Sequence, residues 1–168
     1  MSKLYIITGP AGVGKSTISK KLAEKSAKSV LIEGDEIYHQ VVGGYAPAWK
    51  EGNHLDVFWK VCINTIKIYL ENDYDVVFNY IVTPENLDKL KLAFSAFQIK
   101  FAVLMVDEET LMLRDSLRDE DCQMKERCIV LLKSFRNHNY NKNNIFDTSN
   151  LSVDDSVDTI MNDNRFVL

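Results

Sequence analysis

Apolar residues in this chain occur in two alternating patterns. Short continuous runs predict buried parallel strands, and these cover residues 4–7, 29–33, 75–82, 99–106 and 144–147. Apolar residues at helical spacing and polar helix-start signals predict helices at residues 16–24, 56–71 and 123–136, and others beginning near residues 84, 108 and 153. Because predicted strands and helices alternate, the pattern indicates an α/β fold whose parallel sheet is covered by helices on both faces.

Three of the predicted helices begin with a recognisable N-cap. Thr83 precedes a proline that would occupy the first helical position. Asp107 precedes two glutamates, which favour the positive end of a helix. Ser152 and Asp155 resemble a capping box before the last helix. These signals fix where the second half of the chain changes from strand or loop to helix.

The composition is that of an ordinary globular protein. With 168 residues, of which 46% are hydrophobic and 26% charged, we expect a single domain over residues 1–168. The net charge of −4 gives no support to a nucleic-acid or anionic-membrane partner. No apolar run approaches the roughly 20 residues of a membrane-spanning helix, and we expect no signal peptide before the first strand.

The three cysteines do not form a metal-binding or disulfide pattern. Cys62, Cys122 and Cys128 include no C-x-x-C pair and are odd in number. Cys62 belongs to an apolar helical run, where a free cysteine behaves as a small core residue. These features predict a reduced, cytoplasmic protein, and they leave its oligomeric state open.

Residues 9–16 read Gly-Pro-Ala-Gly-Val-Gly-Lys-Ser and match the phosphate-binding loop G-x-x-x-x-G-K-[ST], also called the Walker A motif. The motif lies between a predicted strand and a predicted helix, which is the context that this loop requires. Its glycines let backbone N–H groups surround phosphate oxygens, and the helix N-terminus adds partial positive charge. We therefore expect a nucleoside triphosphate to bind Gly9, Ala11, Gly12, Val13, Gly14, Lys15, Ser16 and Thr17. Lys15 would reach the β- and γ-phosphates, and the Ser16 hydroxyl would bind Mg²⁺.

Two classes of phosphate-loop protein fit the sequence poorly. A GTP-driven switch needs an aspartate three residues before a glycine and an N-K-x-D string, whereas residues 141–144 read Asn-Lys-Asn-Asn. A large motor ATPase is disfavoured because the chain is little longer than a nucleotide-binding core. A small kinase remains the principal interpretation, with an ATP-binding regulatory protein that lacks turnover as an alternative.

The distribution of arginines favours the kinase. Of five arginines, four lie between residues 114 and 136, and they flank a polar, turn-rich segment. Phosphoryl transfer requires charged donors around the phosphate, and a segment of this kind would close over the nucleotide as a lid at about residues 114–127. The alternative is a solvated helical face whose arginines pair with nearby carboxylates.

The order of these motifs resembles the small P-loop kinases, a group that includes nucleoside-monophosphate, shikimate and gluconate kinases and chloramphenicol phosphotransferase-like proteins. The resemblance rests on the phosphate loop, on residues 32–35 (Ile-Glu-Gly-Asp), on the arginine-flanked lid and on residues 146–149 (Phe-Asp-Thr-Ser). It implies a P-loop NTPase fold with a five-stranded parallel sheet of order 2-3-1-4-5, a small helical lid and ATP as donor. It also implies that Arg114 and Arg118 touch the donor phosphates, Arg127 less directly, and that Thr148 lies near the adenine.

Asp35 is the candidate catalytic carboxylate. It follows a predicted strand and therefore lies at the carboxyl edge of the sheet, where ligands bind in open α/β folds. There it would accept the proton of a substrate hydroxyl or hold Mg²⁺ together with Ser16, and the resemblance points to the same position. The alternative is an N-cap for a helix starting at Glu36. Many phosphate-loop enzymes end the third strand with a metal-binding aspartate, but here that place holds Asn79.

The segment at residues 36–54 is expected to form the acceptor site. It contains paired glycines, a proline, two tyrosines, a tryptophan and two histidines, but no arginine, and residues 1–113 contain none. Kinases that resemble the nucleoside-monophosphate kinases bind the acceptor phosphate with arginines. We therefore expect phosphotransfer to a small, unphosphorylated hydroxyl compound, with a nucleoside-monophosphate kinase as the alternative. The predicted catalytic residues are Lys15, Asp35, Arg114 and Arg118.

Overall fold

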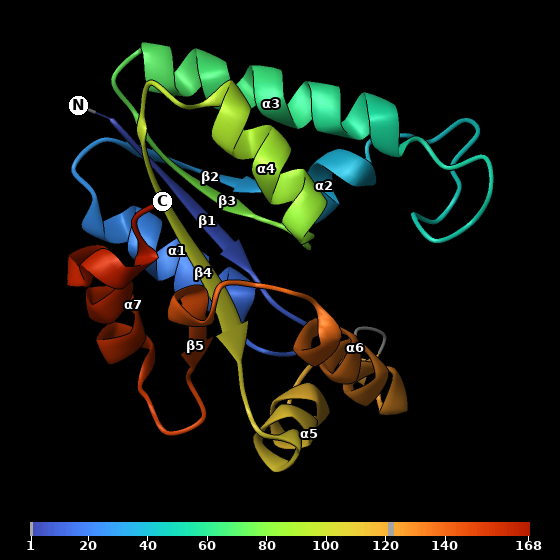
Figure 1. Cartoon of the computed structure of the whole chain (residues 1–168). Coiled ribbons are helices and arrows are strands. Elements are labelled where there is room, and N and C mark those ends of the chain that lie inside the picture. Colours follow the sequence, from blue (N-terminus) through green and yellow to red (C-terminus); the bar gives the residue numbers. More distant parts are fainter. Residues whose placement is uncertain (1, 121–122) are drawn as a thin grey trace.

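A five-stranded parallel sheet forms the centre of the computed structural model, which describes residues 2–120 and 123–168 (Figure 1). The sheet order is β2-β3-β1-β4-β5, as predicted. Its strands are β1 (Lys3–Thr8), β2 (Ser29–Glu33), β3 (Asp75–Asn79), β4 (Gln98–Met105) and β5 (Ile145–Asp147). The helices are α1 (Lys15–Lys25), α2 (Gly34–Tyr38), α3 (Leu55–Glu71), α4 (Pro84–Ala93), α5 (Glu108–Ser116), α6 (Glu126–Asn137) and α7 (Val153–Asn162), with short 3₁₀ turns at Lys142–Asn144 and Asn164–Phe166.

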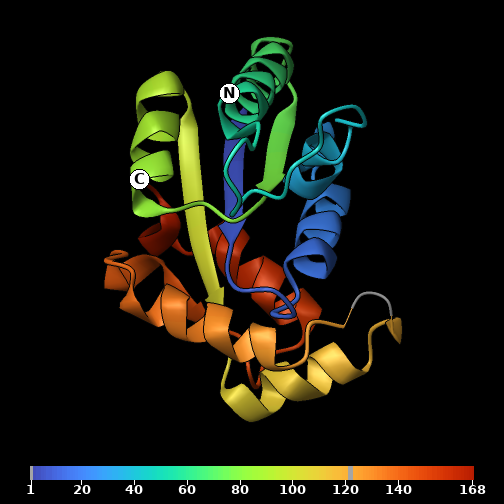
Figure 2. The same cartoon turned by 90° about the vertical axis from the view of Figure 1, so that its right-hand side faces the viewer.

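The core divides into two clusters because strand side chains alternate between the faces of the sheet. Leu4 and Ile6 of β1 pack with α3 and α4, whereas Tyr5 and Ile7 pack with α1 and α7. Figures 1 and 2 show these helix pairs on opposite sides of the sheet, with α5 and α6 across the end where the strands finish. The prediction of an α/β fold with helices on both faces is confirmed.

The predicted N-caps are present. The side chains of Thr83, Asp107 and Ser152 accept hydrogen bonds from backbone N–H groups three residues later, at 3.3, 2.7 and 3.1 Å. Hydrogen bonds of this kind satisfy donors that an unsupported helix start leaves unpaired. The bond from Thr110 also confirms that Asp107 caps α5.

The chain departs from the prediction after β3. This strand ends at Asn79, three residues earlier than its apolar run suggests. Val82 N–H donates to the Thr8 side-chain hydroxyl at 2.9 Å, because the chain turns there from the sheet across the end of β1. Asn79 therefore lies at the carboxyl edge of the sheet, where a polar side chain can serve a site.

Cys62 and Cys128 are free and buried, and Cys122 lies outside the described residues. Within residues 2–120 and 123–168, no helix is long and apolar enough to span a membrane.

Candidate active site

The loop between β1 and α1 takes a path that depends on its glycines. Gly9, Gly12 and Gly14 have φ values of 149°, 83° and 101°, a region that residues with a side chain rarely adopt. A Cβ atom at Gly9 would collide with the carbonyl oxygen of Leu104 in β4. The loop thus lies close against the sheet and leads directly into α1, whose N-terminus carries partial positive charge.

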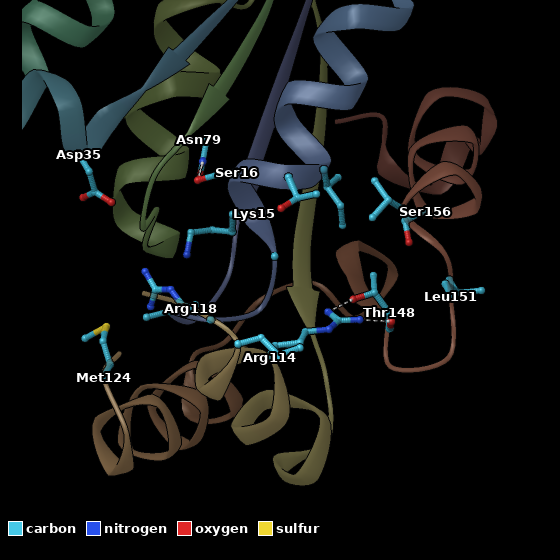
Figure 3. A pocket seen from close by; sticks show the side chains of 17 residues that line it. Lys15, Ser16, Asp35, Asn79, Arg114, Arg118, Met124, Thr148, Leu151 and Ser156 are labelled. Carbon is cyan, nitrogen blue, oxygen red and sulfur yellow. Dashed lines mark hydrogen bonds between the residues drawn. The ribbon is translucent and has the colours of Figure 1, made fainter. Parts of the chain in front are cut away.

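A cavity of about 490 Å³ opens beside this loop. Of the predicted site residues, all except Gly9 and Val13 line it, and Val13 is fully buried behind it. Figure 3 shows Asp35 at one side of the cavity and Thr148, Leu151 and Ser156 at the other, with Lys15 and Ser16 between them. The fold therefore brings together residues from the phosphate loop, α2, α5 and the segment between β5 and α7.

Lys15 is a partly dehydrated cation. Its ammonium donates to the Pro10 carbonyl at 3.0 Å, and no carboxylate of the described residues forms an ion pair with it. The pKa of Lys15 is lowered to about 8, chiefly by burial; Asp35 opposes this shift, and Arg118 contributes a smaller lowering. A dehydrated cation beside glycine N–H groups suits an anionic ligand, as expected for a triphosphate.

Ser16, Glu33 and Asn79 form a hydrogen-bonded triangle next to the phosphate loop. Glu33 Oε2 accepts from Ser16 Oγ at 3.2 Å and from Asn79 Nδ2 at 2.6 Å, while Asn79 Nδ2 lies 3.1 Å from Ser16 Oγ. Burial raises the pKa of Glu33, and the hydrogen bond from Ser16 opposes this shift. Glu33 is thus the carboxylate in direct contact with the predicted Mg²⁺ ligand Ser16.

Glu33 was not among the predicted site residues. Glu33 and Asn79 end adjacent parallel strands and are paired in register, which places their side chains at the same edge of the sheet. No group of three or more histidine, cysteine, aspartate or glutamate residues with metal-binding geometry exists in the described part of the chain. This donor set suits Mg²⁺, which binds one or two protein ligands and otherwise uses water and phosphate oxygens.

Asp35 lies within the first turn of the short helix α2. The helix begins at Gly34, so its N-cap position is Glu33, and no side-chain hydrogen bond caps it. The alternative role of Asp35 as an N-cap is therefore wrong. A Cβ atom at Gly34 would lie 2.5 Å from the Tyr80 ring, so this close approach admits only glycine. The buried Tyr80 ring thus supports the backbone that carries Asp35 into the cavity.

Arg114 connects the phosphate loop to the far end of the cavity. Its guanidinium donates to the Val13 carbonyl at 2.8 Å and to the Thr148 carbonyl at 3.0 Å. The same side chain lies 3.4 Å from the Thr148 hydroxyl. Its partners are backbone carbonyls rather than carboxylates, so the alternative of a helical ion-pair face does not apply to Arg114.

Arg118 and Arg127 have different surroundings. Arg118 lines the cavity on the side of Lys15 and pairs with Asp115 at 3.3 Å (Figure 3). Arg127 lies outside the cavity lining, and its guanidinium stacks over the Trp49 ring at 4.2 Å. Part of the predicted lid thus contacts the segment expected to bind the acceptor; residues 121 and 122 of this lid lie outside the described residues.

Aromatic side chains organise the segment at residues 36–54. The Tyr38 ring stacks on His54 at 4.0 Å between centroids and contacts Phe58 edge-on at 5.5 Å. Tyr45 and Trp49 remain 43% and 67% exposed. The segment therefore has a packed base and two partly exposed aromatic rings at its surface, of which the Trp49 ring is covered in part by Arg127.

A family model described as an AAA domain matches residues 4–130. The chain belongs to this AAA domain family. The match spans the phosphate loop, Asp35 and both arginines of the cavity. No curated protein matches the chain significantly.

Solved structures with the same fold include two that are named as kinases. The chain is similar to a sugar kinase from Janibacter sp., with a TM-score of 0.74 and 12% identity over 96% of this chain and 93% of that one. For a tunicamycin resistance protein from Deinococcus radiodurans, the TM-score is 0.71 and the identity 16%, over 95% of this chain and 94% of that one. For a gluconokinase from Sinorhizobium meliloti, the TM-score is 0.68 and the identity 16%, over 94% of this chain and 89% of that one. The AAA domain match and these structures confirm the resemblance to small P-loop kinases.

Proposed function

We propose that the protein transfers the γ-phosphoryl group of Mg·ATP to a hydroxyl group of a small, unphosphorylated molecule. The observation that carries this proposal is one cavity in which Lys15, Arg118 and Asp35 face one another beside the phosphate loop. Two cations suit the charge that develops on a transferring phosphoryl group, and a carboxylate beside them suits the acceptor hydroxyl.

The donor would lie along the length of the cavity. Its phosphates would contact the glycine-rich loop, Lys15 and the helix N-terminus, while its base would lie near Thr148. Arg114 already joins Val13 to Thr148, so it fixes the distance between the phosphate and base regions. Bound Mg²⁺ would neutralise phosphate charge, with Ser16 and Glu33 as the nearest protein ligands.

Asp35 would act at the acceptor end. Asp35 lies on α2 directly after β2; it lines the cavity and immediately precedes the aromatic segment at residues 36–54. A carboxylate there orients the acceptor hydroxyl and accepts its proton as the new phosphate ester forms. Asp35 was also predicted to bind Mg²⁺; the contact between Glu33 and Ser16 favours Glu33 for that role and leaves Asp35 to the acceptor.

The surroundings of the acceptor end favour an unphosphorylated substrate. The two arginines that line the cavity, Arg114 and Arg118, come from the predicted lid, and Arg118 is paired with Asp115, whereas the segment at residues 36–54 contains no arginine. The similar structures named as a sugar kinase and a gluconokinase agree with a small polyhydroxyl acceptor. One observation favours the alternative, a nucleoside-monophosphate kinase: Arg127 reaches the acceptor segment, where it stacks on Trp49.

The test is release of ADP from Mg·ATP in the presence of two acceptor pools. One pool contains nucleoside monophosphates, and the other contains sugars, sugar acids, nucleosides and other unphosphorylated hydroxyl compounds. Stimulation by the second pool alone supports the proposal, and subdividing that pool identifies the substrate. Stimulation by the first pool indicates the nucleotide kinase, and ATP binding without turnover under any condition indicates a regulatory protein.

A further inference from the structure

Asp115 is a buried carboxylate that the roles above do not use. It lies in the last turn of α5, and only 2% of the residue is exposed. A negative charge is unfavourable at the C-terminal end of a helix, and a buried charge is costly unless hydrogen bonds satisfy it. Interactions within α5 therefore do not explain an aspartate at this position, and its stabilising partners must come from outside the helix.

The lid supplies the partners of this carboxylate. Met124 N–H lies 3.1 and 3.0 Å from the two oxygens, and Lys125 N–H donates to Oδ2 at 2.8 Å. Arg118 Nη1 donates to Oδ1 at 3.3 Å. Burial alone would raise the pKa of Asp115, but these hydrogen bonds hold it below its ordinary value, so the group remains ionised.

The turn held by Asp115 has an unusual backbone. Lys125 has φ 50° and ψ −129°, and α6 begins at the next residue without a side-chain N-cap. A non-glycine residue in such a conformation persists only where its surroundings impose it. The two backbone N–H groups bound by Asp115 provide this constraint and fix where α6 starts relative to α5.

The same residue lies directly behind the phosphate loop. A Cβ atom at Gly12 would be 3.3 Å from Leu111, 3.5 Å from Cys128 Sγ and 3.8 Å from Asp115 Cβ. On the other side, Arg118 extends from Asp115 into the cavity near Lys15 (Figure 3). Asp115 therefore contacts the lid turn, the cavity arginine and the packing that supports the phosphate loop.

We propose that Asp115 is a positioning residue that holds Arg118 and the turn at residues 124–125 over the phosphate loop before nucleotide binds. This inference rests on the proposed phosphotransferase function. Charged donors stabilise a transition state most when they are already oriented, because no reorganisation is then needed during the reaction. An arginine side chain has many rotamers, and 38% of the Arg118 side chain is exposed, so an anchor at its guanidinium restricts it substantially.

A double-mutant cycle tests this role. Asp115→Asn is nearly isosteric but removes the charge. The side-chain NH₂ group of the asparagine would also face one of the two backbone N–H groups, so that two hydrogen-bond donors would oppose each other. We expect kcat for ATP turnover to fall about 10-fold or more, with KM for ATP changed less than about 3-fold, because the phosphate loop itself is intact. In an Arg118→Ala background, Asp115→Asn should cause little further loss, since the two residues act together.

Asp163 provides a matched control. It also accepts a backbone N–H, that of Arg165 at 2.8 Å, and forms an ion pair with the same arginine at 3.0 Å, but it is remote from the cavity lining. Asp163→Asn should leave kcat within about twofold of wild type, as for most surface substitutions. Thermal melts establish that each variant is folded.

The outcomes separate this inference from the proposed function. If the wild type is active, two results refute the positioning role alone. One is that the losses in kcat add in the double-mutant cycle, and the other is that Asp115→Asn and Asp163→Asn have equal rates. A wild type that neither transfers nor hydrolyses the γ-phosphate refutes the proposed function and this role with it. If Asp115→Asn does not fold, Asp115→Glu carries the test, because it keeps the charge but displaces it. That variant should also lower kcat and lose its effect when Arg118 is absent, and an unchanged kcat contradicts the inference.

Discussion

The low pKa of Lys15 predicts that nucleotide affinity falls steeply above pH 8. Burial lowers the pKa of the free protein's Lys15 to about 8, whereas phosphate oxygens around a bound nucleotide favour the charged form. Between pH 7 and pH 9, the charged fraction in the free protein falls from about nine-tenths to about one-tenth. Affinity should therefore fall about 10-fold over this range, and binding at pH 9 should take up nearly one proton.

Isothermal titration calorimetry with Mg·ADP at pH 7, 8 and 9 measures both quantities. Two buffers of different ionisation enthalpy at each pH give the number of protons taken up. Lys15→Met is the control, because it removes the titrating group and should give weak binding that no longer depends on pH in this range. An affinity for the wild-type protein that is constant from pH 7 to pH 9, with no proton uptake, would refute the reasoning.

Three further predictions concern the residues around the cavity. Asp35→Asn should lower the turnover rate by about 10²-fold or more while leaving Mg·ADP affinity unchanged in calorimetry, and near-normal turnover would exclude Asp35 as the base. Glu33→Gln should raise the Mg²⁺ concentration for half-maximal turnover by about 10-fold or more, and an unchanged Mg²⁺ titration would remove Glu33 from the metal site. Gly34→Ala should lower the free energy of unfolding by about 1–3 kcal/mol, because its methyl group overlaps the Tyr80 ring. The melting temperature should fall by about 2–4 °C for each kcal/mol, and an unchanged melting curve would contradict the predicted overlap.

The sequence predicted the fold well because its signals are local. The phosphate loop, the apolar runs and the N-caps at Thr83, Asp107 and Ser152 each depend on residues close together in the chain, and the loop and the caps are found where expected. The end of β3 was placed too late because Tyr80–Val82 are as apolar as a strand. Their direction depends instead on a long-range hydrogen bond to Thr8.

The parts of the site that were missed depend on contacts between distant segments. Glu33 reads as the last residue of a strand, and only the register between β2 and β3 brings it to Asn79 and then to Ser16. Asp115 is one of the carboxylates near the lid arginines and does pair with Arg118, but it also accepts hydrogen bonds from backbone N–H groups nine and ten residues later. A carboxylate in the last turn of a helix was the signal available, because the helix dipole disfavours it there.

The most direct test of the account follows the γ-phosphoryl group itself. The protein is incubated with Mg·ATP labelled at the γ-phosphate and with both acceptor pools together, the unphosphorylated hydroxyl compounds and the nucleoside monophosphates, and the labelled products are separated and identified by mass spectrometry. We predict that the label appears in a phosphate monoester of one of the hydroxyl compounds, and that Lys15→Met abolishes the transfer. Label that remains in ATP, appears only as inorganic phosphate, or passes instead to a nucleoside monophosphate would contradict it.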